Sequence, residues 1–74
     1  MIFEIKGEYI TLGQFLKATD WISSGGEAKF AVKELNIYVN NEKEDRRGRK
    51  LYPNDFVQIE EKKYELKWKL KKFH

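Results

Sequence analysis

The chain has 74 residues, a net charge of +3 and no cysteine. This length allows one small domain, residues 1–74, without room for a catalytic module beside a binding module, and the lack of cysteine excludes disulfides and thiolate metal sites. No apolar run reaches the roughly 20 residues of a membrane span, and the N-terminus lacks a signal-peptide pattern. We therefore expect a soluble, cytoplasmic protein with no membrane partner.

The first predicted elements are a strand and a helix. Residues 2–6 have the composition of a short strand that Gly7 ends. Thr11 and Gln14 then match a capping box, in which each side chain accepts a hydrogen bond from the backbone amide of the other residue. Apolar residues continue at helical spacing as far as Ile22, so the pattern predicts a first helix of about three turns.

A second, shorter helix follows the break at residues 23–26. Ser24 and Glu27 match a second capping box, and the apolar stripe of this helix is formed by Ala28, Ala31, Val32 and Leu35. Asn36 is predicted to end the helix in a left-handed conformation, which Asn tolerates better than most residues.

The hydrophobic period then changes from 3.6 to 2. Strands are predicted at residues 37–40, 56–59 and 64–70, with turns at Asn40-Asn41 and at residues 53–55. The last strand has one apolar face and one lysine face, and the lysine face of residues 62–72 is expected to be a solubilising outer face, or to protect an edge strand, rather than to form a specific site. The predicted fold class is α+β, with two helices packed on a small, mostly antiparallel β-sheet.

Positive charge is concentrated in two places. Residues 1–60 carry nine Lys/Arg against ten Asp/Glu, whereas residues 61–74 carry six Lys against two Glu. All three arginines lie in the segment Arg46-Arg47-Gly48-Arg49-Lys50. Guanidinium groups present paired donors that suit phosphate oxygens. The arginine segment, together with the positive charge of the lysine-rich C-terminal strand, therefore favours a polyanion partner.

The arginine segment also has a simpler interpretation. Charged runs between strands are commonly solvated hairpin tips, and Glu42, Glu44 and Asp45 could pair with the arginines across the turn. Surface pairs contribute only about 0–1 kcal/mol, so they would not explain why arginine is concentrated here. Tyr38 and Tyr52 lie close by in sequence and are candidates for stacking on unpaired bases, or are half-buried strand residues.

The Gly25-Gly26 turn has two interpretations as well. As structure, it permits a tight connection between helices, and this is favoured when the turn is taken alone. As a site, it would expose backbone N–H groups to phosphate, with Lys29 adding a contact one turn later.

The residues do not favour catalysis. The one histidine is the terminal His74, the serines at 23 and 24 suit helix capping, and no carboxylate stands in an apolar setting. We expect no enzymatic activity, no metal site, no cofactor and no small-molecule substrate.

Together these motifs resemble a known family. Residues 11–17, 24–29, 39–40 and 46–51, in this order and spacing, are similar to the S-four-type RNA-binding domain, named after a small-subunit ribosomal protein. The nearest likeness is to its stand-alone bacterial members, the YaaA-like and YbcJ-like small proteins. The likeness covers about residues 11–59 and implies the L-shaped alpha-L motif, in which two helices precede a small antiparallel sheet.

The resemblance also implies a site. Family members bind structured RNA, often ribosomal RNA, through the first turn of the second helix and an adjoining loop. Carried to this sequence, the site is Ser24, Gly25, Gly26, Lys29, Arg46, Arg47, Arg49 and Lys50. Many family members have an arginine where this chain has Gly25, so the segment 46–50 is predicted to be the main RNA anchor. Asn40-Asn41 and Asn54-Asp55 replace the family's usual Asn-Gly and Gly-Asp turns.

The leading hypothesis is a non-catalytic protein that binds structured RNA, with ribosomal RNA or a ribosomal subunit as partner and a role in ribosome assembly or function. An alternative is a protein-interaction module that docks on an acidic partner through an apolar edge near Trp68 and Phe73. A third, weaker alternative is DNA binding.

Overall fold

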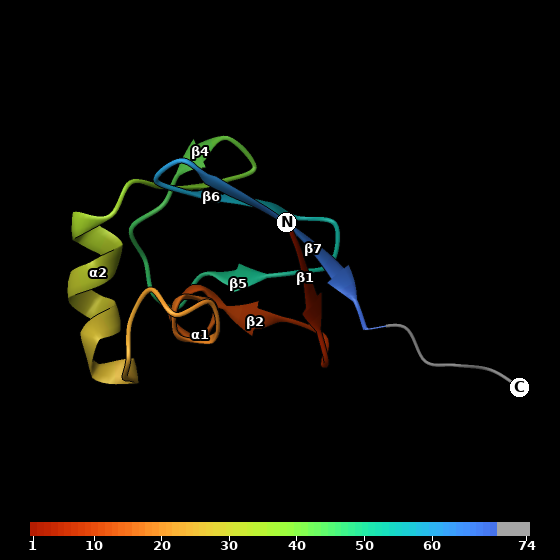
Figure 1. Ribbon diagram of the computed structural model, residues 1–74, viewed down its shortest axis with the longest axis horizontal. Coiled ribbons are helices and arrows are strands. Elements are labelled where there is room, and N and C mark those ends of the chain that lie inside the picture. Colours follow the sequence, from red (N-terminus) through yellow and green to blue (C-terminus); the bar gives the residue numbers. More distant parts are fainter. Residues whose placement is uncertain (70–74) are drawn as a thin grey trace, which may run out of the picture.

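The chain folds around a five-stranded sheet with a separate two-stranded pair beneath it (Figure 1). The computed structural model describes residues 1–69. The elements are β1 Ile2–Ile5, β2 Ile10–Thr11, α1 Leu12–Ala18, the 3-10 turn η1 Gly25–Glu27, α2 Ala28–Glu34, β3 Ile37–Val39, β4 Glu42–Lys43, β5 Lys50–Leu51, β6 Phe56–Ile59 and β7 Lys62–Trp68. The predicted α+β class is confirmed. Residues 70–74 lie outside the described range; they include the end of the predicted last strand and of its lysine face, as well as Phe73 and His74.

The large sheet has the strand order β1-β7-β6-β3-β4, so β7 lies between two strands and the interpretation of its lysines as edge-strand protection is wrong. Its pairs are antiparallel except for β1 and β7, which run parallel with Ile2 opposite Glu65. The second sheet is the antiparallel pair of β2 and β5, with Ile10 opposite Leu51. Strands β2, β4 and β5 have two residues each, too few for alternation to reveal them, and the sequence did not predict them.

The core lies between α1 and the sheets. Phe15 of α1 is fully buried at its centre, with the ring of Phe3 at 4.9 Å on one side and that of Tyr64 at 5.1 Å on another, both edge to face. Trp21 closes the end of this cluster, because its indole nitrogen donates to the Tyr64 hydroxyl at 3.0 Å. The other buried apolar residues are Ile5, Leu12, Leu16, Ile22, Ala28, Val32, Ile37, Val39, Leu51, Val57, Ile59 and Leu66.

Helix α1 begins as predicted but ends early. The Thr11–Gln14 capping box is present. The helix then stops at Ala18, so the prediction of three turns reaching Ile22 is wrong. Asp20 adopts a left-handed φ of 65°, its amide donates to the Lys17 carbonyl, and the next amide, of Trp21, donates to Leu16. This is a Schellman ending, and it was not foreseen because the left-handed residue is Asp rather than Gly.

Both predicted ends of the second helix are also wrong in detail. The Ser24 side chain makes no capping bond; instead Glu27 reaches back to Ser23, whose hydroxyl donates to it at 2.9 Å. The helix therefore begins with the 3-10 turn η1. At the other end Leu35 is already extended and Asn36 is not left-handed. The Asn36 amide donates to the Glu60 carboxylate at 2.6 Å, which holds the helix end against the β6–β7 turn.

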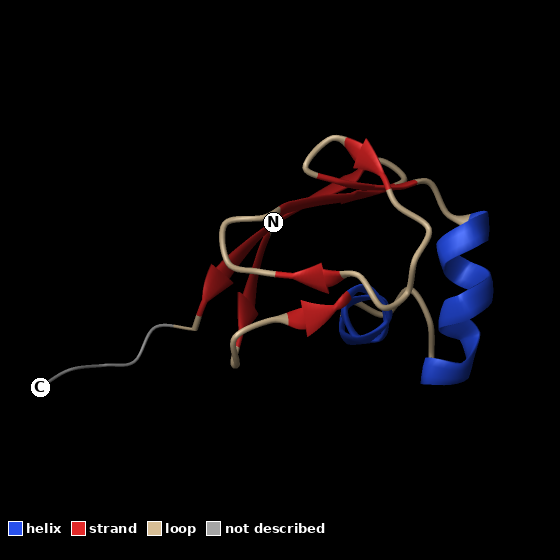
Figure 2. Ribbon diagram, turned by 180° about the vertical axis from the view of Figure 1, so that it is seen from behind, coloured by secondary structure: helices blue, strands red, loops and turns tan. Residues whose placement is uncertain are grey.

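The predicted asparagine turns are confirmed. Asn40 and Asn41 have φ values of 52° and 70°, the two left-handed positions that a tight hairpin between β3 and β4 requires. Asn54 follows Pro53 with a φ of 77°, and the Asp55 amide closes this turn on the Tyr52 carbonyl at 3.0 Å. Seen from behind, α2 stands at one end of the molecule, across α1 from the strands β1 and β7 (Figure 2). None of the helices within residues 1–69 is long and apolar enough to cross a membrane.

Candidate nucleic-acid interface

The arginine segment lies in a loop that passes from one sheet to the other. Strand β4 before the loop pairs with β3, and β5 after it pairs with β2. The loop is fixed to the start of α1, because the amides of Leu12 and Gly13 donate to the carbonyls of Arg49 and Arg47 at 2.8 and 2.9 Å. These are amides of the first helical turn, which have no partner within the helix. The interpretation as a hairpin tip is therefore wrong, because the loop is a connection held between two sheets and a helix.

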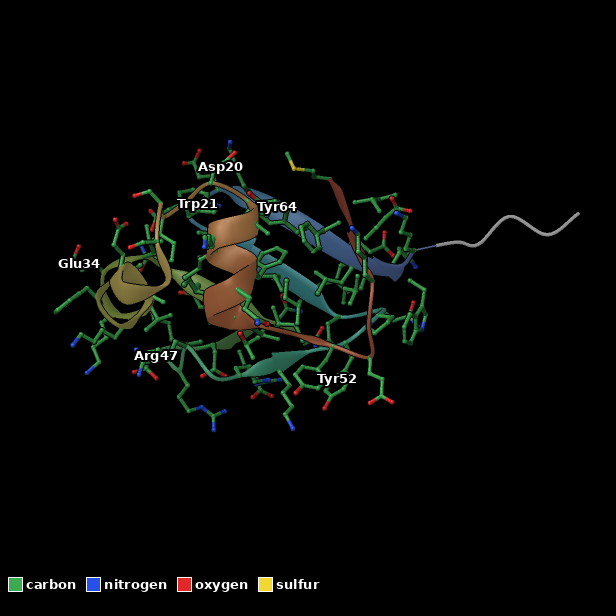
Figure 3. The ribbon with its side chains drawn as sticks, turned by 90° about the horizontal axis from the view of Figure 1, so that it is seen from below. Asp20, Trp21, Glu34, Arg47, Tyr52 and Tyr64 are labelled. Atoms are coloured by element: carbon green, nitrogen blue, oxygen red, sulfur yellow. The ribbon has the colours of Figure 1, made fainter. Side chains whose placement is uncertain are left out.

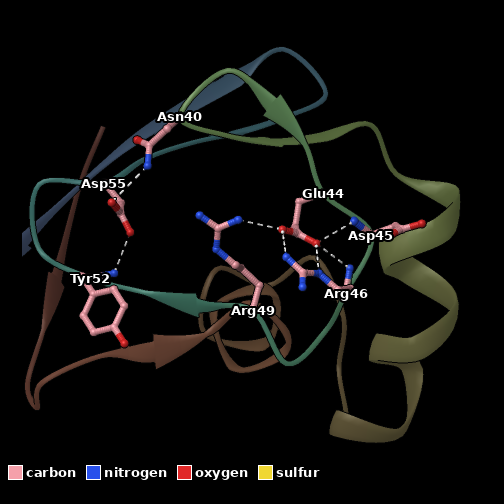
Figure 4. Close-up of polar contacts among 7 residues, drawn as sticks. All are labelled: Asn40, Glu44, Asp45, Arg46, Arg49, Tyr52 and Asp55. Carbon is pink, nitrogen blue, oxygen red and sulfur yellow. Dashed lines mark hydrogen bonds and ion pairs between the residues drawn. The ribbon is translucent and has the colours of Figure 1, made fainter.

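Glu44 organises this loop from the inside. It is only 4% exposed. Its carboxylate accepts from Arg46 Nε at 2.9 Å and from Arg49 Nη1 at 2.8 Å, as Figure 4 shows. It also accepts from the backbone amides of Arg46 and Asp45 at 3.0 and 3.2 Å. A buried carboxylate with this many donors is stabilised in its charged form.

These donors shift the pKa of Glu44. The side-chain hydrogen bond from Arg46 is the strongest influence; burial acts against it, and the Arg46 amide and Arg49 add to it. The net effect lowers the pKa of the Glu44 carboxyl from 4.5 to about 2. The same carboxylate raises the pKa of the Arg46 guanidinium. The pairing is thus partly buried, unlike the exposed surface pairs that the sequence suggested.

The three arginines consequently differ in their roles. Arg46 and Arg49 both bind Glu44, with side chains 72% and 31% exposed. The exposed Arg47 makes no side-chain hydrogen bond or ion pair to any residue of the described part of the chain. Its guanidinium is the one of the three whose charge is not opposed by Glu44.

A groove forms where this loop meets the two helices. It has a volume of about 440 Å³ and is lined by Thr11, Gly13, Gln14, Lys17, Gly25, Ala28, Arg47 and Gly48. The loop and α2 pack closely around Gly13, since a Cβ there would come within 3.3 Å of the Ala28 side chain and 3.4 Å of the Arg47 carbonyl. Figure 3 shows Arg47 and Tyr52 on one side of the molecule, beyond the N-terminal end of α1, with Asp20 at its other end.

The groove joins parts of both predicted regions. Gly25 of the helix start and Arg47 of the loop line the same surface, although they are 22 positions apart in the chain. Ser24, Gly26 and Lys29 are exposed but do not line it. Lys17 and Gln14 do line it; they were not predicted as site residues, because Gln14 was assigned only to the capping box and Lys17 only to the motif of residues 11–17.

Gly25 leaves open space at the edge of the groove. A Cβ at this position would meet no atom within 4 Å, and its φ is not left-handed. A Cβ therefore fits at Gly25 without moving its neighbours.

A second cleft lies on the other side of the loop. It has a volume of about 510 Å³ and is lined by Arg46, Gly48, Arg49, Lys50 and Tyr52. The predicted stacking residues are not brought together: Tyr52 borders this cleft, whereas Tyr38 lies in β3 on the large sheet, with Lys43 Nζ 5.4 Å from its ring centre. Within residues 1–69 no group of three or more acidic or histidine side chains is placed to hold a metal ion.

Comparison with known proteins agrees with this architecture. The family model described as "S4 domain" matches residues 3–67, a range that includes most of β1 and of β7 as well as the motifs between them. The chain therefore belongs to the S4 domain family, which confirms the resemblance found in the sequence. It is also 57% identical over 56 residues to "Probable ribosome maturation protein RlbA" of Bacillus subtilis (strain 168), an alignment that covers 76% of this chain and 79% of that protein.

Proposed function

We propose that this protein binds structured RNA without catalysing a reaction, that its target is ribosomal RNA, and that it acts in maturation of the ribosome. Membership of the S4 domain family supports the first part. The printed name of the Bacillus subtilis relative, a probable ribosome maturation protein, supports the connection with the ribosome.

The observation that carries this proposal is the groove between α1, the start of α2 and the arginine loop. Arg47 and Lys17 contribute positive charge to it, and none of the described residues that line it is acidic. Gly25 and Gly48 place no side chain in the way, so a sugar–phosphate backbone can approach the protein backbone closely. A basic groove without acidic residues favours phosphate over uncharged ligands.

The second cleft extends this surface. Arg46 and Arg49 are held in place by Glu44, which limits how far they can swing, and Lys50 follows directly in β5. Arginines already held by a carboxylate lose less side-chain freedom when they bind phosphate. We assign Arg47 the main phosphate contact, and Arg46, Arg49 and Lys50 supporting contacts; Ser24, Gly26 and Lys29 flank the groove.

The test is a salt titration of binding to purified ribosomal RNA. Arg47→Ala should weaken binding and reduce the slope of log K against log salt by about 0.7–0.9, the contribution of one phosphate contact. Lys63→Ala removes the same charge from the outer face of the large sheet and serves as the matched control. Equal slopes for the two variants would contradict the assignment. Arg46→Ala and Arg49→Ala are less informative, because each would also disturb Glu44.

The protein-interaction alternative has one structural observation in its favour. Ile2 and Phe56 lie on either side of Glu65 across three neighbouring strands, and they are 65% and 56% exposed. Trp68, at the end of β7, is 50% exposed, but it lies three positions from Glu65 and opposite the buried Ile5. It therefore faces the other side of the sheet and is not part of the patch formed by Ile2 and Phe56. This patch is separate from the groove.

DNA binding is addressed by competition: structured RNA should displace labelled RNA at lower concentration than duplex DNA does.

A further inference from the structure

We propose that Tyr9 and Tyr52 form a platform on which an unpaired RNA base stacks, next to the phosphate-binding cleft. This inference rests on the proposed RNA-binding function and specifies it further: the target would be RNA with an exposed base in a loop, a bulge or an end. It adds Tyr9, which carried no signal in the sequence, and replaces Tyr38 as the partner of Tyr52.

The two tyrosines are brought together by the β2–β5 pair. Ile10 lies opposite Leu51 in this antiparallel ladder, so Tyr9 and Tyr52, one position further out on each strand, are cross-strand neighbours. Their ring centres are 6.0 Å apart. Leu51 points inward and is fully buried, and alternation along a strand turns the adjacent Tyr52 outward.

The rings are exposed although they are large and aromatic. Tyr9 is 42% and Tyr52 46% exposed. The planes are tilted by 54°, so the two rings do not cover each other face to face. Neither hydroxyl makes a hydrogen bond within residues 1–69. A pair of tyrosines that contributes little to the core, and that leaves ring surface open, suits a planar ligand.

The backbone around Tyr52 is held rigidly. Its amide donates to the Asp55 carboxylate at 2.8 Å, and its carbonyl accepts from the Asp55 amide at 3.0 Å. Asp55 is bound in turn by the Asn40 side chain at 3.1 Å, and Figure 4 shows this connection from Asn40 through Asp55 to Tyr52. Pro53 further restricts the chain. A pre-positioned ring loses little freedom on binding.

The charges next to the platform identify the ligand class. Lys50 Nζ lies over the Tyr9 ring, 4.9 Å from its centre, so this face of Tyr9 is in contact with a cation, and Tyr52 borders the cleft that contains Arg46, Arg49 and Lys50. The site thus offers ring faces and cations side by side, which matches a nucleotide with its flat base and charged phosphate. In a duplex the base faces are covered by their neighbours, so only an unpaired or terminal base can use the platform.

The experiment compares two RNA probes. One is a stem-loop with a 2-aminopurine in the loop, and the other is a blunt duplex of the same length with that base paired. We expect the stem-loop to bind more tightly and its 2-aminopurine fluorescence to be quenched on binding. Tyr52→Ala and Tyr9→Ala should each weaken stem-loop binding on the order of 10-fold and remove the quenching, while affecting duplex binding much less.

Control variants separate stacking from folding. Tyr52→Phe and Tyr9→Phe retain the ring and should keep both affinity and quenching, and Tyr38→Ala should leave both unchanged. If the alanine variants bind and quench as the parent does, or if the parent shows no preference for the stem-loop, the platform is refuted while phosphate binding stands. If neither probe binds the parent at low salt, the proposed function itself fails, and the platform with it.

Discussion

Replacing Glu44 with Gln tests whether the buried carboxylate holds the arginine loop. The substitution keeps the shape of the side chain but removes its charge, so Arg46 and Arg49 lose a charged acceptor and face an NH₂ group in place of one oxygen. Changing the buried partner of this partly buried pairing is more damaging than losing a fully exposed pair, because Arg49, 31% exposed, is left without its charged partner, whereas water can solvate the exposed Arg46.

The expected size follows from the pKa of Glu44. A pKa of about 2 in the folded protein against 4.5 corresponds to about 3 kcal/mol of stability at neutral pH, at about 1.4 kcal/mol per pKa unit. Since the folded-state pKa is the lower one, this contribution is fully present above about pH 5 and is lost as the pH falls toward 2. A 74-residue domain has a total stability of about 4–11 kcal/mol, so the loss should be easily measured.

The assay is urea unfolding followed by tryptophan fluorescence at a series of pH values from 7 to 2. The parent should lose stability steeply between pH 5 and pH 2. Glu44→Gln should be about 2–3 kcal/mol less stable at pH 7 and show a flatter profile over the same range. Glu61→Gln, at an exposed turn position, is the matched control and should follow the parent. Parallel profiles for the parent and Glu44→Gln would show that Glu44 does not hold the loop.

Two further variants test the groove and the end of α1. Gly25→Arg should strengthen RNA binding by several fold, measured by the fluorescence anisotropy of a labelled RNA, because a Cβ has open space there and the variant restores an arginine at the groove edge. Gly7→Arg, where a Cβ also has open space but which lies outside the groove, should have a smaller effect; equal effects would mean that only net charge matters. Asp20→Gly should raise the free energy of unfolding, measured with urea, by about 0.5–1 kcal/mol, since Gly adopts the left-handed φ of 65° without strain. Asp20→Ala should lower this free energy. The reverse order of the two variants would rule out strain at this position.

Local rules predicted those parts of the fold that local interactions determine. The capping box of Thr11 and Gln14 and the turn at Asn40-Asn41 depend on neighbouring residues, and both are present in the structure. The end of α1 at Asp20 was missed because Asp in the left-handed conformation gives a weaker signal than Gly. The pairing of β2 with β5 was missed because two-residue strands are stabilised by their partner, which is distant in the sequence.

The candidate site shows the same division. Arginine clustering led to the prediction that residues 46–50 bind phosphate. Charge alone could not show that Glu44 would be buried and paired with two of the three arginines. Burial of a carboxylate depends on how the loop packs between the sheets and α1. Likewise Tyr9 gave no signal, because it meets Tyr52 only through the β2–β5 pairing.

The most direct test of the central claim is a pull-down of the tagged protein from bacterial lysate, with and without nuclease treatment, followed by identification of the bound RNA and protein. The proposal predicts that ribosomal RNA is recovered with the parent and with the double variant Lys62→Ala/Lys63→Ala. Its recovery should be strongly reduced with the double variant Lys17→Ala/Arg47→Ala. Nuclease treatment should release the proteins bound to the parent. Proteins that remain bound after nuclease treatment, to the parent and the Lys17/Arg47 variant alike, would contradict RNA binding through the groove and favour a protein-docking module.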